Sequence, residues 1–254
     1  MKIITCNSTK GGTGKSTLSI ILLNALSRAG YKCLTIDMDM INHSTSFYLN
    51  AGIPYQTILK KNIFRVFAGS SVKDNVLHIT DKVDLLHADV RLSDFRSIET
   101  FQRLKSAIEK LDYDYIIIDT APTFDNIVIN TFMASDTLLI PIQQDIFNYQ
   151  SVKYLFKKLS ELGLSHLDIH IILNHYEKPR SETTYTNQLI ELFKKEKTIS
   201  KFISPVHISK SSTIKKYINT QGYRLNARKE TQKSYTELVE LIKLITGITI
   251  EGDI

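Results

Sequence analysis

A glycine-rich segment near the start of the chain combines residue types that bind phosphate. Residues 10–17 read Lys-Gly-Gly-Thr-Gly-Lys-Ser-Thr and lie between an apolar stretch, Lys2–Cys6, and a helix-like stretch that begins at Thr17. In such a setting, glycines let several backbone N–H groups point at one anion, and the helix N-terminus adds a partial positive charge. The segment therefore predicts a loop that binds the phosphates of a nucleotide.

Two side chains of this loop have roles that follow from their chemistry. Lys15 is placed to reach the β- and γ-phosphates, and the Ser16 hydroxyl is placed to ligate Mg²⁺. The usual pattern, G-x-x-x-x-G-K-[ST], requires glycine where this chain has Thr9, and a second lysine, Lys10, stands at the mouth of the loop. We expect the nucleotide to be bound by Lys10, Gly11, Gly12, Thr13, Gly14, Lys15, Ser16 and Thr17.

Carboxylates follow two further apolar stretches. Asp37 and Asp39 come at the end of the second strand-like stretch, and Asp119 ends the β-branched run Tyr115–Ile118. The carboxyl ends of adjacent parallel strands border the crevice in which nucleotides bind. An acid in that place can hold Mg²⁺ or its waters, or orient an attacking water.

The elements that must position these residues alternate along the whole chain. This alternation predicts an α/β fold, a doubly wound and mainly parallel sheet with helices on both faces. Residues 50–80 give no clear assignment. Strands are expected at Lys2–Cys6, Lys32–Ile36, Val83–Leu86, Tyr115–Ile118, Thr137–Ile140, Ile169–Leu173 and near Phe202–Val206. Helices are expected at Thr17–Arg28, Glu99–Leu111, Asn126–Met133, Tyr149–Leu162, around Tyr185–Lys195, Ser211–Asn219 and Thr231–Ile245.

Composition and charge limit the class of protein. Hydrophobic residues make up 43% and charged residues 23% of 254 residues, which excludes wholesale disorder, collagen and a disulfide scaffold. The longest apolar run, Leu18–Leu26, is too short to span a bilayer, and we expect no signal peptide, because a hydrophilic glycine loop follows Cys6. Cys6 and Cys33 fall in apolar segments, which suits a reducing compartment. We expect a cytoplasmic protein.

The net charge of +6 is unevenly distributed. Residues 1–148 carry 15 basic and 15 acidic side chains, whereas the remainder carries 17 and 11. Residues 194–233 hold eleven basic side chains against two acidic ones. This asymmetry suggests a polyanionic partner, nucleic acid or anionic lipid, although a solvated lysine-rich face has the same composition.

Together these motifs resemble the ParA/MinD group of ATPases, whose phosphate loop carries an extra lysine, and most closely the plasmid and chromosome partition proteins called ParA. The resemblance implies a P-loop NTPase fold with a deviant Walker A loop, in one ParA-like ATPase domain over residues 1–254. It covers nearly the whole chain and rests on Lys10–Thr17, Ile36–Asp39, Tyr115–Pro122, Ala134–Pro141 and Leu173–Asn174.

The resemblance also implies roles for individual residues. ATP, ADP and Mg²⁺ would be the ligands, and ATP would be hydrolysed in a sandwich dimer in which Lys10 reaches the phosphates of the other subunit. Asp39 would position the attacking water, and Asp119 would hold the Mg²⁺ shell and couple hydrolysis to conformation. Asn174 and the backbone near Pro205 match the positions that hold adenine. The catalytic set would be Lys10, Lys15 and Asp39, and the metal set Ser16, Asp39 and Asp119.

The implied function is DNA partition. ATP-bound homodimers would bind DNA non-specifically, and a ParB-like centromere-binding partner on the cargo DNA would stimulate the hydrolysis that releases them. We expect a nucleoid-associated protein of the small type, without an N-terminal helix-turn-helix domain. His207 stands where many relatives have an arginine associated with DNA binding. From the basic run 194–233 we expect DNA contacts by Lys215 and Lys216 first and by Lys210 and Arg224 next, and the resemblance adds Arg180.

Two alternatives stay open at this point. A MinD-like membrane-associated positioning ATPase would need a basic amphipathic helix at its C-terminal end, whereas residues 247–254 are short and acidic, so we expect no stable membrane binding. A nucleotide-dependent scaffold that does not hydrolyse ATP is disfavoured, because Lys15, Ser16, Asp39 and Asp119 are all present.

Overall fold

The computed structural model describes residues 1–49, 52–178, 185–220, 225–226, 228 and 231–254. Its strands form one eight-stranded sheet in the order β3-β4-β2-β5-β1-β6-β7-β8. All described neighbours pair in parallel except β3 and β4. The strands are β1 (Lys2–Cys6), β2 (Cys33–Met38), β3 (Leu77–Thr80), β4 (Val83–Leu86), β5 (Tyr115–Thr120), β6 (Thr137–Ile142), β7 (Asp168–Tyr176) and β8 (Ile208–Ser209).

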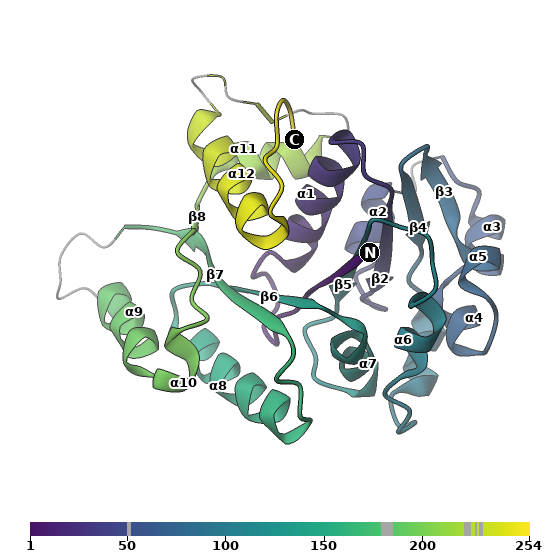
Figure 1. Ribbon diagram of the computed structural model, residues 1–254, viewed down its shortest axis with the longest axis horizontal. Helices are drawn as coiled ribbons and strands as arrows, with labels where there is room; N and C mark the ends of the chain where they lie inside the picture. Colours follow the sequence, from purple (N-terminus) through teal and green to yellow (C-terminus); the bar gives the residue numbers. More distant parts are fainter. Residues whose placement is uncertain (50–51, 179–184, 221–224, 227, 229–230) are drawn as a thin grey trace.

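Helices cover both faces of this sheet. Figure 1 shows α1, α11 and α12 together on one side and α7 and α8 on the other. The helices are α1 (Lys15–Arg28), α2 (Ser44–Leu49), α3 (Tyr55–Lys60), α4 (Ile63–Phe67), α5 (Val72–Asn75), α6 (Arg103–Ile108), α7 (Asn126–Ala134), α8 (Ile146–Glu161), α9 (Tyr185–Lys195), α10 (Lys197–Ser200), α11 (Ser212–Asn219) and α12 (Gln232–Thr246), with a 3₁₀ turn η1 (Val90–Phe95).

The β-branched run of β5 explains how the two layers form. Ile117 packs into the apolar cluster that contains α1 and α12, while Ile116 and Ile118 pack into the cluster that contains α4 and α6. Because successive side chains of a strand point to opposite faces, both faces of this strand are buried and both need apolar residues. The expected doubly wound sheet is confirmed. Cys6 and Cys33 are buried, free thiols in this core.

Two local expectations differ from the structure, and one unassigned stretch is resolved by it. The strand expected near Phe202–Val206 is wrong: only Ile203 forms an isolated bridge there, to Ile171, and the strand itself is Ile208–Ser209. The helix expected at Glu99–Leu111 is limited to Arg103–Ile108. The unassigned stretch 50–80 contributes helices of four to six residues and the antiparallel edge strand β3.

Candidate functional site

The glycine loop connects β1 to α1 in a conformation that needs glycine. Gly12 and Gly14 have φ angles of 74° and 102°, in the left-handed region that other L-residues rarely adopt. A Cβ atom at Gly14 would lie 2.2 Å from the Asn174 side-chain nitrogen. Gly14 is also the N-cap of α1 and provides no side-chain hydrogen bond. The first N–H groups of α1 therefore remain available to an anion.

Two amide side chains bind carbonyl groups of the loop. Gln143, just after β6, donates to the Gly12 carbonyl at 2.9 Å, and Asn174 on β7 donates to the Thr13 carbonyl at 2.7 Å. Because these two carbonyls are bound by side chains, the loop is held in place while its N–H groups stay available for an anion. Sequence reasoning missed Gln143, whose signal was its place at the carboxyl end of a parallel strand.

Lys15 is the loop cation, and it is nearly buried. Its side chain is 7% exposed, and its ammonium donates to the Lys10 carbonyl at 3.4 Å. Burial lowers the pKa of the Lys15 ammonium, while Asp119 and Asp39 act in the opposite direction. This ammonium is partly shielded from water, and its hydrogen bond to the Lys10 carbonyl is weak. Its attraction to a phosphate would therefore be strong.

Asp37 and Asp119 lie side by side at the ends of β2 and β5, where they are register partners. Both are fully buried, and Asp37 accepts hydrogen bonds from the backbone N–H groups of Asp39 and Ser46 at 2.9 and 2.8 Å. Burial raises the pKa of both carboxyls, and the charge of Asp37 raises that of Asp119 further. When no cation lies near them, two adjacent buried carboxyl groups are not readily ionised together, because their negative charges repel each other and are shielded from water.

Asp119 retains one oxygen for a further ligand. Its Oδ2 accepts the Thr45 hydroxyl at 2.7 Å, whereas Oδ1 is buried without a hydrogen-bond partner in the described part of the chain. Hydroxyl and carboxylate oxygens are the donors that Mg²⁺ prefers. The orphaned oxygen, together with Ser16 on the first turn of α1, fits a Mg²⁺ ion and its water shell.

Asp39 is held within its own turn. Its Oδ1 accepts the N–H groups of Ile41 and Asn42 at 3.1 and 3.0 Å, and its Oδ2 accepts the Asn42 side-chain amide at 2.9 Å. Because a carboxylate oxygen has two lone pairs, Oδ2 keeps one for a water molecule. The structure therefore leaves Asp39 able to orient water.

Lys10 contacts its own subunit in this structure. Its ammonium is 2.7 Å from Asp145, and it lies 5.7 Å from the centre of the Phe147 ring. Asp145 also caps α8 by accepting the Asn148 N–H at 3.0 Å. Although partial burial raises it, the pKa of Asp145 is lowered by the hydrogen bonds from Lys10 and Asn148. Lys10 must leave this ion pair before it can act elsewhere.

The two positions expected around adenine are not brought together. Asn174 lines a cavity of about 580 Å³ beside α1, with Thr17 and residues 208–212. Pro205 lines a separate apolar cavity of about 220 Å³ near α9. The first cavity adjoins the phosphate loop, so residues 208–212 are better placed than Pro205 to contact a base.

The basic residues expected to bind DNA occupy different environments. Lys210 pairs with Glu177 at 2.8 Å, while Lys215 and Lys216 lie exposed on α11. Arg180 and Arg224 lie outside the described residues. The His207 ring packs against Tyr176 in a tilted arrangement, with ring centres 4.2 Å apart and planes 48° apart.

The basic run 194–233 does not form one surface. Figure 1 places α9 and α10, which carry its first lysines, well away from α11. The charge of this run is therefore divided between two parts of the molecule.

Other candidate sites find no support. The described residues contain no group of three or more His, Cys, Asp or Glu side chains arranged to hold a metal ion. Within the described chain, no helix has the length and apolar character needed to span a membrane.

A glycine loop between the first strand and first helix of a doubly wound sheet defines a P-loop α/β protein. A profile of the AAA domain family (AAA_31) matches residues 1–173. The chain belongs to this family, the ParA/MinD group of P-loop ATPases.

Individual relatives agree with this assignment. The chain is 28% identical over 181 residues to the sporulation initiation inhibitor protein Soj of Bacillus subtilis, covering 68% of this chain and 70% of that protein. It is 26% identical to the virulence plasmid ParA family protein pGP5-D of Chlamydia psittaci, covering 91% and 95%. A structure of the Borrelia burgdorferi B31 protein BB_S35, a candidate plasmid partition protein bound to AMPPNP, superposes with a TM-score of 0.76 at 28% identity, covering 96% and 98%.

Proposed function

We propose that this protein is an ATP-dependent DNA partition ATPase that dimerises on ATP, binds DNA non-specifically and is reset by hydrolysis. The observation that carries the proposal is the phosphate loop with both Lys10 and Lys15, set beside Asp39 and Asp119. The likeness to the AMPPNP-bound Borrelia protein over nearly the whole chain supports ATP and ADP as ligands.

The proposed chemistry assigns a task to each residue. The loop N–H groups and Lys15 bind the phosphates, and Asp39 orients the attacking water with its free lone pair. Ser16 and Asp119 would hold Mg²⁺, with Asp39 nearby. When bound, the ion neutralises charge on the phosphates. Lys10 leaves Asp145 and adds its charge to the site of the other subunit.

Exposed apolar side chains support a dimer on the loop side of the molecule. Ile41 follows Asp39, Phe47 lies on α2, and Phe147 lies beside Lys10; they are 72%, 79% and 66% exposed. Large side chains of this kind contribute about 1.5–3 kcal/mol each when fully buried. We propose that ATP brings two such faces together, and that a ParB-like partner protein stimulates the hydrolysis that separates them. The proposed location is the nucleoid in the cytoplasm, without stable membrane binding.

The proposal is tested by measuring DNA binding by fluorescence anisotropy with ATP, with ADP and without nucleotide. We expect the tightest binding with ATP, a steep loss of affinity with salt and little dependence on sequence, because phosphate contacts carry no sequence information. Phosphate release is measured in parallel, and anionic vesicles replace DNA in a third series. Lys15→Ala is the control and should lose the ATP effect. Equal DNA affinity in all three nucleotide conditions would contradict the proposal.

A further inference from the structure

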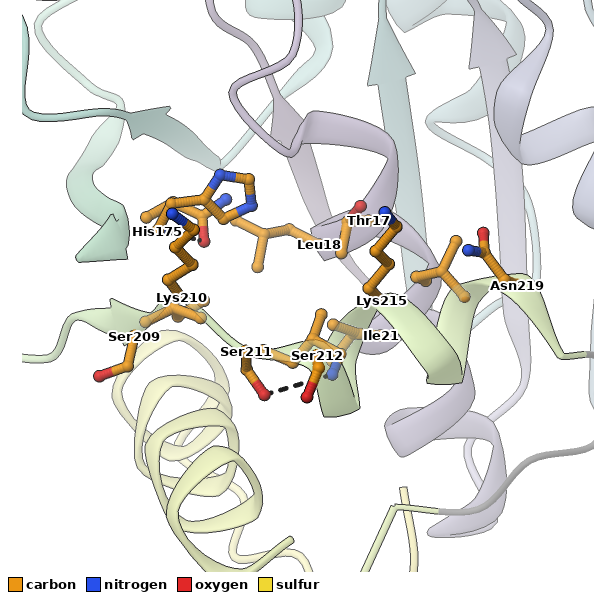
Figure 2. Close-up of a pocket in the computed structure, with 14 residues that line it drawn as sticks. Thr17, Leu18, Ile21, His175, Ser209, Lys210, Ser211, Ser212, Lys215 and Asn219 are labelled. Carbon is orange, nitrogen blue, oxygen red and sulfur yellow. Dashed lines mark hydrogen bonds between the residues drawn. The ribbon is translucent and has the colours of Figure 1, made fainter. Parts of the chain in front are cut away.

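The cavity beside the phosphate loop has a shape suited to the rest of a nucleotide. It measures about 580 Å³, and Figure 2 shows it between the start of α1 and the segment that runs from β8 into α11. This volume lies within the range of small-molecule sites. Because Thr17 lines the cavity and directly follows Ser16, a ligand with its phosphates in the loop would extend into this space.

The walls of the cavity combine an apolar floor with polar edges. Leu18, Ile21 and Ile214 provide apolar surface, and Ser212 provides a hydroxyl group, whereas the Ser209 hydroxyl donates to Glu237 at 2.6 Å. The N-terminus of α11 is already capped, because Ser211 accepts the N–H of Thr213 at 3.1 Å. An anion in the cavity would therefore depend on side chains or on α1 for its binding.

Lys215 is the side chain placed to supply that charge. In Figure 2 it extends from α11 on the side that faces α1, and it lines the same cavity as Thr17. The first turn of α1 contains no acidic residue. Lys215 forms no ion pair with any residue in the described ranges, whereas Lys210 is paired with Glu177 at 2.8 Å. A lysine beside a helix N-terminus is electrostatically unfavourable until an anion lies between them.

The neighbouring lysine serves as an internal comparison. Lys216 also lies exposed on α11 but does not line the cavity. Consecutive residues of an α-helix are about 100° apart around its axis, so the two lysines face different directions. One helix therefore directs one lysine toward the cavity and another away from it.

We propose that Lys215 is a nucleotide-binding residue that contacts the phosphate nearest the ribose. The inference rests on the proposed nucleotide-binding function, and it moves Lys215 from the expected DNA-binding set to the nucleotide site. A contact between Lys215 and the nucleotide would link α11 to the ligand. Helix α11 is in turn attached to α1, where Asn24 donates to the buried Tyr217 hydroxyl at 2.7 Å.

The test compares the binding of ADP and adenosine by isothermal titration calorimetry. A charge-assisted hydrogen bond to phosphate predicts about tenfold weaker ADP binding for Lys215→Met. Adenosine binding should be unchanged, since it has no phosphate, and Lys215→Arg should bind ADP nearly as well as the natural protein. The matched control, Lys216→Met, should leave ADP affinity unchanged. Circular dichroism melting checks that all variants fold.

Two results would overturn the inference in distinguishable ways. If Lys215→Met binds ADP normally while Lys15→Ala does not, the phosphate loop stands and the role of Lys215 is wrong. If Lys15→Ala also binds ADP normally, the proposed loop itself is wrong. Weaker plasmid DNA binding by Lys215→Met with unchanged ADP affinity would return Lys215 to the DNA surface.

Discussion

At the scale of single residues, the paired carboxylates Asp37 and Asp119 make stability depend on pH. Burial raises their pKa values, so the folded protein retains a proton that the unfolded chain releases at lower pH. The free energy of unfolding should therefore fall as pH rises from about 4, the ordinary value for aspartate, toward about 7, the raised pKa of Asp119. For one proton whose pKa is displaced by about three units, the expected loss is on the order of 4 kcal/mol.

Asp119→Asn removes one member of the pair and should flatten this pH dependence. Urea unfolding without nucleotide, from pH 4.5 to 7.5, measures it. Asp112→Asn is the control, because Asp112 is fully exposed and its loss should leave the slope unchanged. An Asp119→Asn slope equal to that of the natural protein would show that the pair is ionised throughout this range.

The residue types of the loop predicted much of the candidate site. The site residues that could not be predicted, Gln143 and Thr45, share a physical cause. Lys15, Ser16 and the strand-end aspartates can be found because the motif and the end of each strand are local in the sequence. Gln143 and Thr45 act through contacts with loops and strands far from them in the chain, which no local pattern records. Asn174, expected near adenine, is seen to hold the Thr13 carbonyl as well.

At the scale of elements, the ion pair between Lys10 and Asp145 connects the phosphate loop to α8. Asp145→Asn keeps a good helix cap but weakens the hold on Lys10. If Lys10 must leave Asp145 to reach the other subunit, this variant should dimerise with ATP at up to about thirtyfold lower protein concentration, since two exposed pairs break per dimer and each contributes up to about 1 kcal/mol. Analytical ultracentrifugation measures the dissociation constant.

Asp145→Ala separates the two roles of this residue. It releases Lys10 and also removes the cap, so thermal unfolding should show a loss of about 1 kcal/mol that Asp145→Asn does not show. Unchanged dimerisation in both variants would mean that the contact does not restrain Lys10.

Element boundaries show why sequence patterns succeed for some segments and fail for others. β5 is buried on both faces and reads as an unbroken β-branched run, so its position is evident. β8 has only two residues, and its position depends on pairing with β7, which the sequence does not encode locally. The helices between residues 55 and 75 are too short to show helical periodicity.

At the scale of the whole molecule, the proposed exchange of Lys10 between subunits can be tested by mixing variants. Lys10→Ala and Asp39→Ala should each lose hydrolysis alone. A heterodimer contains one site with an intact Asp39 and an intact Lys10 from the other subunit. An equal mixture should therefore regain about a quarter of the natural rate, because half of the dimers have one complete site.

Phosphate release measures the rate, and differently tagged subunits confirm that heterodimers form. No recovery of hydrolysis in proven heterodimers would mean that Lys10 acts within its own subunit. The Lys10→Ala protein alone, at the same total concentration, gives the background rate of phosphate release.

The exposed Phe47 has a practical consequence for observing these events. It borders a groove of about 560 Å³ together with Ser16 and Ser44, and the chain contains no tryptophan. Phe47→Trp would thus create a single indole fluorophore next to the first turn of α1. Its emission would be free of background from other indoles, so stopped-flow mixing could resolve ligand arrival and subunit association as separate phases.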